Sequence, residues 1–142
     1  VQLHGDESLV EAAALSEAFE LPFLRAIKLP LGSLETNALE IAIAPWVDAG
    51  FHPLLDADAG ASHGGSGKTL DWESIGDWSQ RNGGSNFTLA GGLNPKNVAE
   101  AMRRSGAKSV DTASGVENPR GVKNADLIEA FTRAAATSGT RD

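Results

Sequence analysis

The sequence predicts an α/β fold built from parallel strands and crossover helices. Five short apolar runs alternate with five longer amphipathic runs, and each strand–helix unit takes about 20 to 30 residues, as in a parallel sheet with helical crossovers. Both an open doubly wound sheet and part of an eight-stranded (β/α)8 barrel fit this alternation. No G-x-G-x-x-G motif follows the first strand, which disfavours a dinucleotide-binding fold. A whole barrel, in turn, needs roughly 200–250 residues.

The composition limits the class of protein. The chain has 142 residues, of which 41% are hydrophobic, so we expect one folded domain over residues 1–142. No apolar run approaches the ~20 residues of a membrane-spanning helix, and a net charge of −7 disfavours nucleic acid as a partner. The absence of cysteine excludes a disulfide framework and thiolate catalysis within the chain. These features predict a soluble cytoplasmic domain.

The first of the five units begins at the first residue of the chain. The opening sequence "VQLH" reads as the interior of a strand, so we expect a strand at 1–3 and a helix at 8–19. The second unit is a strand at 24–29 followed by a helix at 34–49. Pro45 should kink or interrupt that helix, because proline lacks the backbone N–H and its ring clashes with the preceding turn.

The third unit combines a strand at 53–56 with a helix at 71–79. Asp71 is placed to cap this helix, since a side-chain carboxylate can accept hydrogen bonds from the first free backbone N–H groups. The helix carries three large apolar residues, Trp72, Ile75 and Trp78.

The last two units have strands at 87–90 and 109–111 and helices at 95–105 and 124–136. Asn94 can cap the first of these helices with Pro95 at its first position, and Gly106 can end it. Val98 and Met102 stack one turn apart. Asn124 can cap the last helix, in which three apolar residues share one face: Leu127, Phe131 and Ala134.

The stretch "GGSGKT" at 64–69 is similar to a nucleotide-binding P-loop but lacks part of the motif. The P-loop requires a further glycine where this chain has Ser62. The preceding strand, at 53–56, also ends well upstream, so the loop is too long to form a tight cradle between a strand and a helix. The sequence therefore disfavours an ATP or GTP site here.

Polar residues and glycines gather where the predicted strands end. Ligands bind at these carboxyl ends in both candidate architectures. The residues in question are Gln2, His4 and Gly5 at the end of the first strand, Arg25 and Lys28 on the second, Asp56 on the third, Gly91 and Gly92 at the end of the fourth, and Asp111, Ser114 and Gly115 at the end of the fifth.

Two glycine-containing pairs predict a phosphate site. Gly91-Gly92 and Ser114-Gly115 follow consecutive strands. Glycine lets the backbone approach a ligand, and exposed amides beside a helix N-terminus bind a dianion. A shared phosphate site on the last two strand-to-helix loops recurs in barrels of this kind. The alternative is that each pair only forms a tight turn.

Asp56 is the candidate general acid. It follows Leu54 and Leu55 at the end of a buried strand, where burial would raise the pKa of a carboxyl group. The alternative is a cap or an ion-pair partner for the following loop. His4 could serve equally as a core histidine or as a ligand contact, whereas His52 and His63 fall in predicted loops. The three histidines lack metal-site spacing, so we expect no metal.

Five stretches together resemble one family, phosphoribosylanthranilate isomerase of tryptophan biosynthesis. They follow the family's order: "VQLHGDE" at 1–7, "LLDA" at 54–57, "GGSGKTLDW" at 64–72, "LAGGLNPKNV" at 89–98 and "DTASGVENPRGVKN" at 111–124. The resemblance implies a (β/α)8 barrel, here with strands four to eight and their helices. It also implies that "GGSGKT" is the long loop after the sixth barrel strand.

The family's reaction is an Amadori rearrangement, in which N-(5-phosphoribosyl)anthranilate becomes an aminoketose without any cofactor. A general acid protonates the ribose ring oxygen, and a general base then removes the C2 proton. By this resemblance Asp56 would be the acid, and Asp111 would face the sugar hydroxyls. The phosphate would lie against Gly91, Gly92, Ser114 and Gly115. The pocket would be lined by Gln2 and His4, with Arg25 as a further substrate-binding candidate.

The chain departs from the family in one respect that matters for catalysis. The family's base is a cysteine in a "K-I-C-G" motif on the first strand, and neither the motif nor any cysteine is present. We therefore expect the C-terminal five-eighths of a barrel, with open edges at 1–3 and 109–111 and with the N-terminal barrel segment as a required partner. The alternatives are a dual-substrate isomerase that also serves histidine biosynthesis and a non-catalytic phosphate-binding barrel fragment. The oligomeric state stays open.

Overall fold

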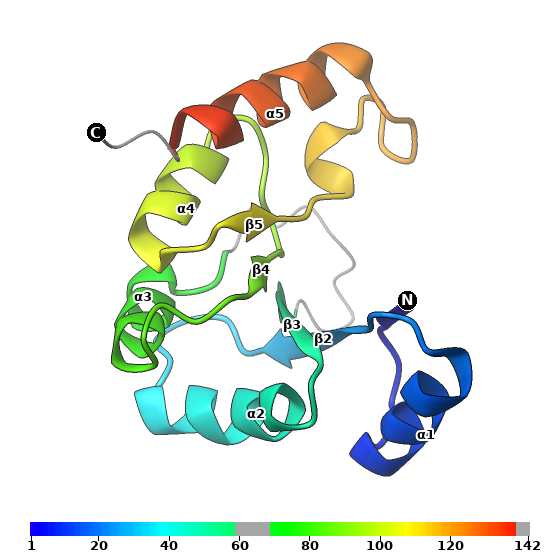
Figure 1. Cartoon of the computed structure of the whole chain (residues 1–142). Helices are drawn as coiled ribbons and strands as arrows, with labels where there is room; N and C mark the ends of the chain where they lie inside the picture. The colour runs from blue at the N-terminus through cyan, green and yellow to red at the C-terminus, as the bar shows by residue number, and fades with distance from the viewer. Residues whose placement is uncertain (59–68, 139–142) are drawn as a thin grey trace.

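The computed structural model describes residues 1–58 and 69–138. It contains a parallel five-stranded sheet, with helices following the strands (Figure 1). The strands are β1 (Gln2–Leu3), β2 (Leu24–Leu29), β3 (His52–Ala57), β4 (Thr88–Leu89) and β5 (Ser109–Val110). The helices are α1 (Leu9–Phe19), α2 (Thr36–Asp48), α3 (Trp72–Arg81), α4 (Val98–Ser105) and α5 (Ala125–Ser138), with a 3-10 turn η1 (Ser114–Val116).

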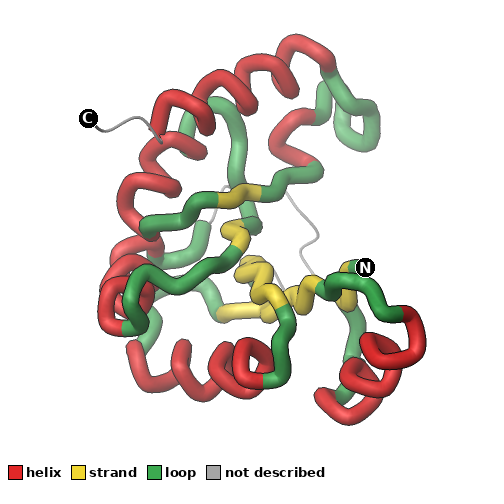
Figure 2. Tube along the Cα trace, in the orientation of Figure 1, coloured by secondary structure: helices red, strands yellow, loops and turns green. Residues whose placement is uncertain are grey.

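The order of the strands distinguishes between the two predicted architectures. The sheet runs β1-β2-β3-β4-β5, with every neighbouring pair parallel. A doubly wound sheet reverses its strand order at a switch point, so that alternative is wrong. In Figure 2 the helices curve in one arc around the outside of the strands. Sequential order with helices on the outer side is the arrangement found in (β/α) barrels.

The register divides the strand residues between two faces of the sheet. Ala26 pairs with Leu54, Ile27 with Leu55 and Lys28 with Asp56. Successive side chains of a strand point to opposite faces. Ile27 and Leu55 join the large core beneath the helices, whereas Ala26 and Leu54 form a small cluster with Ala90 on the other face. We call the face that carries Ile27 and Leu55 the helix-facing side of the sheet. The face that carries Ala26 and Leu54 is the inner side.

The large core lies between the helix-facing side of the sheet and helices α2 to α5. Trp78 meets Phe87 edge to face, with ring centroids 5.8 Å apart. Leu39, Ile43 and Ile75 are fully buried in the same core. Phe131 of α5 is also buried there, with Leu127 and Ala134 packed against the cluster, which confirms the predicted apolar face of this helix.

Most of the predicted elements are confirmed, with differences at their ends. The Asp71 side chain accepts hydrogen bonds from Glu73 N and Ser74 N, and the side chain of Asn124 accepts one from Leu127 N. α1 also begins with a capping box between Ser8 and Glu11.

Two helix predictions need correction. α2 continues through Pro45 rather than breaking there. Pro45 is exposed and lies in the last turn of the helix, so only a short segment follows it. α4 begins at Val98, because residues 95–97 form a separate turn in which Asn94 Oδ1 accepts a hydrogen bond from Lys96 N.

Large apolar side chains remain exposed at the β1 edge of the molecule. On α1, Val10 is 80% exposed and Phe19 61%. α1 buries only Ala12 fully, against Leu3, Phe23 and Phe51. Across residues 1–58 and 69–138, no helix is both long enough and apolar enough to cross a bilayer.

Candidate functional site

His4 and Asp56 come together where β1 and β3 end. His4 Nε2 lies 3.7 Å from Asp56 Oδ2, and the side chains are 52% and 24% exposed, respectively. Asp56 Oδ1 accepts a hydrogen bond of 2.9 Å from Ala57 N. The Asp56 carboxyl is therefore less buried than the sequence led us to expect. An imidazole beside a partly buried carboxyl group is an arrangement that can transfer a proton to or from a bound ligand.

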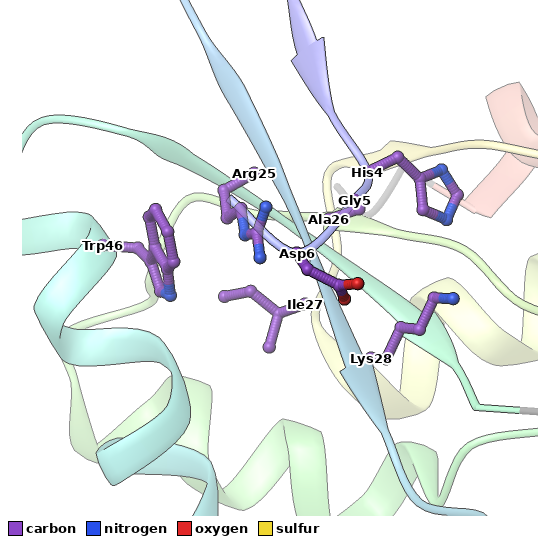
Figure 3. Close-up of a pocket in the computed structure, with 8 residues that line it drawn as sticks. All are labelled: His4, Gly5, Asp6, Arg25, Ala26, Ile27, Lys28 and Trp46. Carbon is purple, nitrogen blue, oxygen red and sulfur yellow. The ribbon is translucent and has the colours of Figure 1, made fainter. Parts of the chain in front are cut away.

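Lys28 lies beside this pair, although the sequence analysis named it only among the polar residues near the strand ends and gave it no role in the site. Lys28 pairs with Asp56 in the register of β2 and β3, so both side chains project from the inner side of the sheet. Figure 3 shows the side chains of Lys28 and His4 on the same side of β2. Alternation along the strand could have identified it, because residues 25 and 28 must lie on opposite faces.

Arg25 lies on the helix-facing side of β2, opposite to the face that carries Lys28 and Asp56. Its Nη1 atom lies 2.5 Å from Glu7 Oε2, and its Cζ atom lies 4.4 Å from the centre of the Trp46 ring. Figure 3 shows the Arg25 and Trp46 side chains together, on the side of β2 away from Lys28. Arg25 therefore does not share the face of Asp56, and its role as a substrate-binding residue stays a prediction.

A pocket of about 220 Å³ opens at this edge of the sheet (Figure 3). It is lined by residues of the β1–α1 loop, of β2 and of α2, namely His4, Gly5, Asp6, Arg25, Ala26, Ile27, Lys28 and Trp46. Its lining is mostly polar or charged, so the pocket suits a polar ligand more than an apolar one.

The loop after β4 lies against the end of β3. Gly91 has φ +81° and Gly92 has φ +68°, which are backbone conformations that favour glycine. A Cβ atom on Gly91 would lie 2.6 Å from Ala57 N, so the loop passes directly over the residue that follows Asp56. The bend is supported by Asn97, whose Nδ2 donates to Gly92 O at 3.0 Å.

The loop after β5 packs against the loop after β4. Thr112 Oγ1 donates a hydrogen bond of 2.7 Å to Leu93 O. A Cβ atom on Gly115 would lie only 1.8 Å from the same carbonyl oxygen. The two glycine loops that the sequence singled out therefore lie side by side. Their contact makes the predicted shared phosphate site geometrically possible.

An ion pair between Lys123 and Glu117 links two parts of the β5–α5 loop. Lys123 Nζ lies 2.8 Å from Glu117 Oε1 and donates a hydrogen bond to Ala113 O, next to Ser114. The hydrogen bond from Lys123, followed by that from Gly121 N, lowers the pKa of the Glu117 carboxyl below its ordinary value of 4.5. This cluster holds the chain that carries Ser114 and Gly115.

The remaining candidates occupy different places. Gln2 is on β1 opposite Leu24 and is exposed, two residues before His4. Asp111 is exposed just after β5, where its amide donates to Leu89 O. His52 is not in a loop as expected: it is the first residue of β3, and its Nε2 lies 2.9 Å from Thr88 Oγ1.

Some of the predictions from the sequence concern residues that the structure does not describe. Five residues of the "GGSGKT" motif, 64–68, and His63 lie there. Among the residues that are described, no three His, Asp or Glu side chains gather in a way that could hold a metal ion.

Comparisons with known proteins identify the family to which the chain is similar. Residues 1–134 match the family model described as N-(5'phosphoribosyl)anthranilate (PRA) isomerase. The N-(5'-phosphoribosyl)anthranilate isomerase of Rhodopseudomonas palustris (strain BisB5) is 40% identical over 97% of this chain and 61% of its own length. The chain thus spans about three fifths of the length of this relative.

Solved structures show the same likeness. The phosphoribosyl anthranilate isomerase of Thermotoga maritima superimposes with a TM-score of 0.77 at 33% identity, covering 96% of this chain and 61% of that one. A phosphoribosyl anthranilate isomerase in complex with reduced 1-(o-carboxyphenylamino)-1-deoxyribulose 5-phosphate gives a TM-score of 0.72 at 28% identity, covering 96% of this chain and 59% of that one. The chain therefore belongs to the N-(5'-phosphoribosyl)anthranilate isomerase family.

Proposed function

We propose that this protein takes part in the isomerisation of N-(5'-phosphoribosyl)anthranilate to the carboxyphenylamino-deoxyribulose phosphate, a step of tryptophan biosynthesis. One observation carries the proposal. The His4–Asp56 pair and the two glycine loops meet at the carboxyl ends of adjacent parallel strands. A phosphorylated sugar requires a proton-transfer group and a phosphate site at the same end of the sheet, so this proximity supports the proposal.

Asp56 is the proposed general acid. A carboxylic acid at this position would donate its proton to the ribose ring oxygen as the ring opens, leaving the C1–nitrogen bond as an iminium ion. Loss of the C2 proton to a base then gives an enolamine, which becomes the ketose. The contact of 3.7 Å between His4 Nε2 and Asp56 Oδ2 supports a role for His4 in holding the carboxyl group or the substrate beside it. The proposal assigns the acid and leaves the base unassigned.

The loops after β4 and β5 are the proposed phosphate site, formed by Gly91, Gly92, Ser114 and Gly115. The positive φ values of Gly91 and Gly92 and the close approach of Gly115 to Leu93 support this placement. Backbone N–H groups in such bends bind dianions without a cationic side chain. The relative solved with the reduced deoxyribulose 5-phosphate compound carries a ligand of this chemistry.

Three exposed polar residues complete the proposed substrate contacts. Asp111 would face the sugar hydroxyls, and Gln2 would line the pocket beside His4. Lys28, opposite Asp56 in the register, would place a positive charge near the substrate's acidic groups. We further propose that β1 to β5 correspond to strands four to eight of the family's barrel, since the matching motifs and the strands follow one order.

The test is the loss of anthranilate fluorescence as the substrate is consumed, measured with the wild-type protein and with Asp56→Asn, each supplied with the N-terminal barrel segment expected from the sequence. Asp77→Asn, on the exposed surface of α3, is the matched control. Turnover that requires Asp56 but not Asp77 supports the proposal. Turnover that survives Asp56→Asn rejects the assignment of the acid. Binding of the reduced deoxyribulose 5-phosphate compound without Asp56-dependent turnover would instead support a phosphate-binding barrel segment.

A further inference from the structure

Glu7 folds back onto the loop that begins with His4. Its Oε2 atom accepts a hydrogen bond of 3.0 Å from Gly5 N and lies 2.5 Å from Arg25 Nη1. A Cβ atom on Gly5 would lie 3.0 Å from Glu7 Oε1, so the carboxylate packs tightly over residue 5. One carboxylate therefore joins the β1–α1 loop to β2.

Arg25 is itself held from a second side. Its side chain is 12% exposed, and its guanidinium lies 4.4 Å from the centre of the Trp46 ring on α2. The Trp46 ring in turn meets Phe51 edge to face, with ring centroids 5.6 Å apart. A guanidinium between a carboxylate and an aromatic face gains both a charge-assisted hydrogen bond and a cation–π contact. Arg25 thus has little freedom to move.

These contacts connect α2 and β2 to one short segment. α2 and β2 hold Arg25, Arg25 and Gly5 hold Glu7, and the segment of residues 4–7 carries His4 toward Asp56. Figure 3 shows Arg25 and Trp46 on one side of the β1–α1 loop and His4 on the other. No ligand contact is needed for Arg25 to matter to the site.

We propose that Glu7 and Arg25 are positioning residues, whose ion pair fixes the segment of residues 4–7 so that His4 stays beside Asp56. The consequence for catalysis rests on the proposed function, whereas the consequence for the geometry does not. Hydrogen bonding by the backbone amide of Glu7, followed by the Arg25 guanidinium, lowers the pKa of the Glu7 carboxyl. Glu7 therefore remains ionised, and the pair intact, through the neutral range.

The first test measures geometry by NMR and needs no enzymatic activity. In the wild-type chain, Asp56→Asn should shift the ring resonances of His4, because the two side chains are in contact. In Arg25→Met, which keeps the apolar stem but loses the guanidinium, the same Asp56→Asn change should shift them much less. Glu7→Gln is the second variant, since it removes the charge at a partly exposed side chain and leaves the fold least disturbed.

Arg104→Met is the matched control. Arg104 forms ion pairs with Glu73 and Glu100 at 2.7 and 3.3 Å on α3 and α4, remote in the fold from His4. This variant should leave the coupling between His4 and Asp56 as it is in the wild type. Equal coupling in Arg25→Met, Glu7→Gln and the wild type would overturn the proposal.

The second test separates positioning from general stability by kinetics. Displacement of a site group by about 1 Å costs on the order of 100-fold in rate, so Arg25→Met should lower kcat by roughly 10- to 100-fold and change KM little. In a His4→Ala background, Arg25→Met should cost almost nothing further, since it acts through His4. Arg25→Lys, which keeps the charge, should recover part of the activity. Additive losses in the double variant would contradict positioning. If no isomerase turnover occurs even when the N-terminal barrel segment expected from the sequence is supplied, the proposed function fails. The NMR result would still decide this inference.

Discussion

Substitution of Gly115 by alanine should weaken phosphate binding through a steric effect that the structure defines. A Cβ atom there would lie 1.8 Å from Leu93 O and 2.7 Å from Thr112 Oγ1. The loops after β4 and β5 would have to separate by more than about 1 Å to relieve the overlap, which also strains the hydrogen bond from Thr112 to Leu93 O. The separation moves the amides of both loops that are proposed to hold the phosphate.

The expected costs can be set out for stability and for binding. Overpacking of this kind costs about 1–3 kcal/mol, and loss of one hydrogen bond adds roughly 0.5–1.5 kcal/mol. For the ligand, loss of a single good contact to the phosphate, worth about 1.4 kcal/mol, is a tenfold change in Kd. We therefore expect Gly115→Ala to unfold at lower urea concentration and to bind the phosphate-bearing ligand at least tenfold more weakly.

Gly76→Ala provides the control for general destabilisation. A Cβ atom on Gly76 would lie 2.2 Å from Arg104 O, at the contact between α3 and α4. The two variants should lose stability to a similar degree in urea denaturation. Calorimetric titration with the reduced deoxyribulose 5-phosphate compound should then show weaker binding in Gly115→Ala alone. Wild-type affinity in Gly115→Ala, or equal loss in both variants, would refute the shared phosphate site.

Three further predictions concern the charged residues of the site. Asp56→Asn should lower kcat by at least about 100-fold, the scale of general-acid catalysis, while calorimetry shows ligand affinity within roughly tenfold of the wild type. Lys28→Met should raise KM more than it lowers kcat in steady-state assays, because its charge is proposed to contact the bound substrate rather than to move a proton. The pKa of Glu117 is lowered by Lys123, so its stabilising contribution is present above the ordinary value of 4.5 and is lost as the pH falls through the lower folded-state pKa. Thermal unfolding between neutral and acid pH should therefore show a smaller loss of stability in Glu117→Gln than in the wild type.

The helix ends and strand positions could be predicted because local chemistry determines them. Asp71 and Asn124 cap their helices as expected, since a side-chain acceptor beside free N–H groups acts within one turn. Pro45 shows the limit of that reasoning. Its effect depends on how many residues follow it in the helix and on whether the ring faces solvent, and neither is visible in a local pattern.

The candidate site was harder to predict where the face of a strand mattered. Arg25 and Lys28 are equivalent by composition, yet only Lys28 shares the face of Asp56. Arg25 meets Glu7, eighteen residues away, and Trp46 on the following helix. Such contacts depend on sheet register and helix packing, which the sequence alone does not specify. The contact between the two glycine loops could be anticipated, because consecutive parallel strands end at the same edge.

The most direct test of the proposed site is to map the ligand onto the backbone by NMR. On addition of the reduced deoxyribulose 5-phosphate compound, the account predicts the largest amide shifts at Gly91, Gly92, Ser114 and Gly115, with loss of these shifts in Gly92→Val. Shifts concentrated at the opposite ends of the strands, in the pocket lined by Gly50, His52 and Asn82, would contradict it.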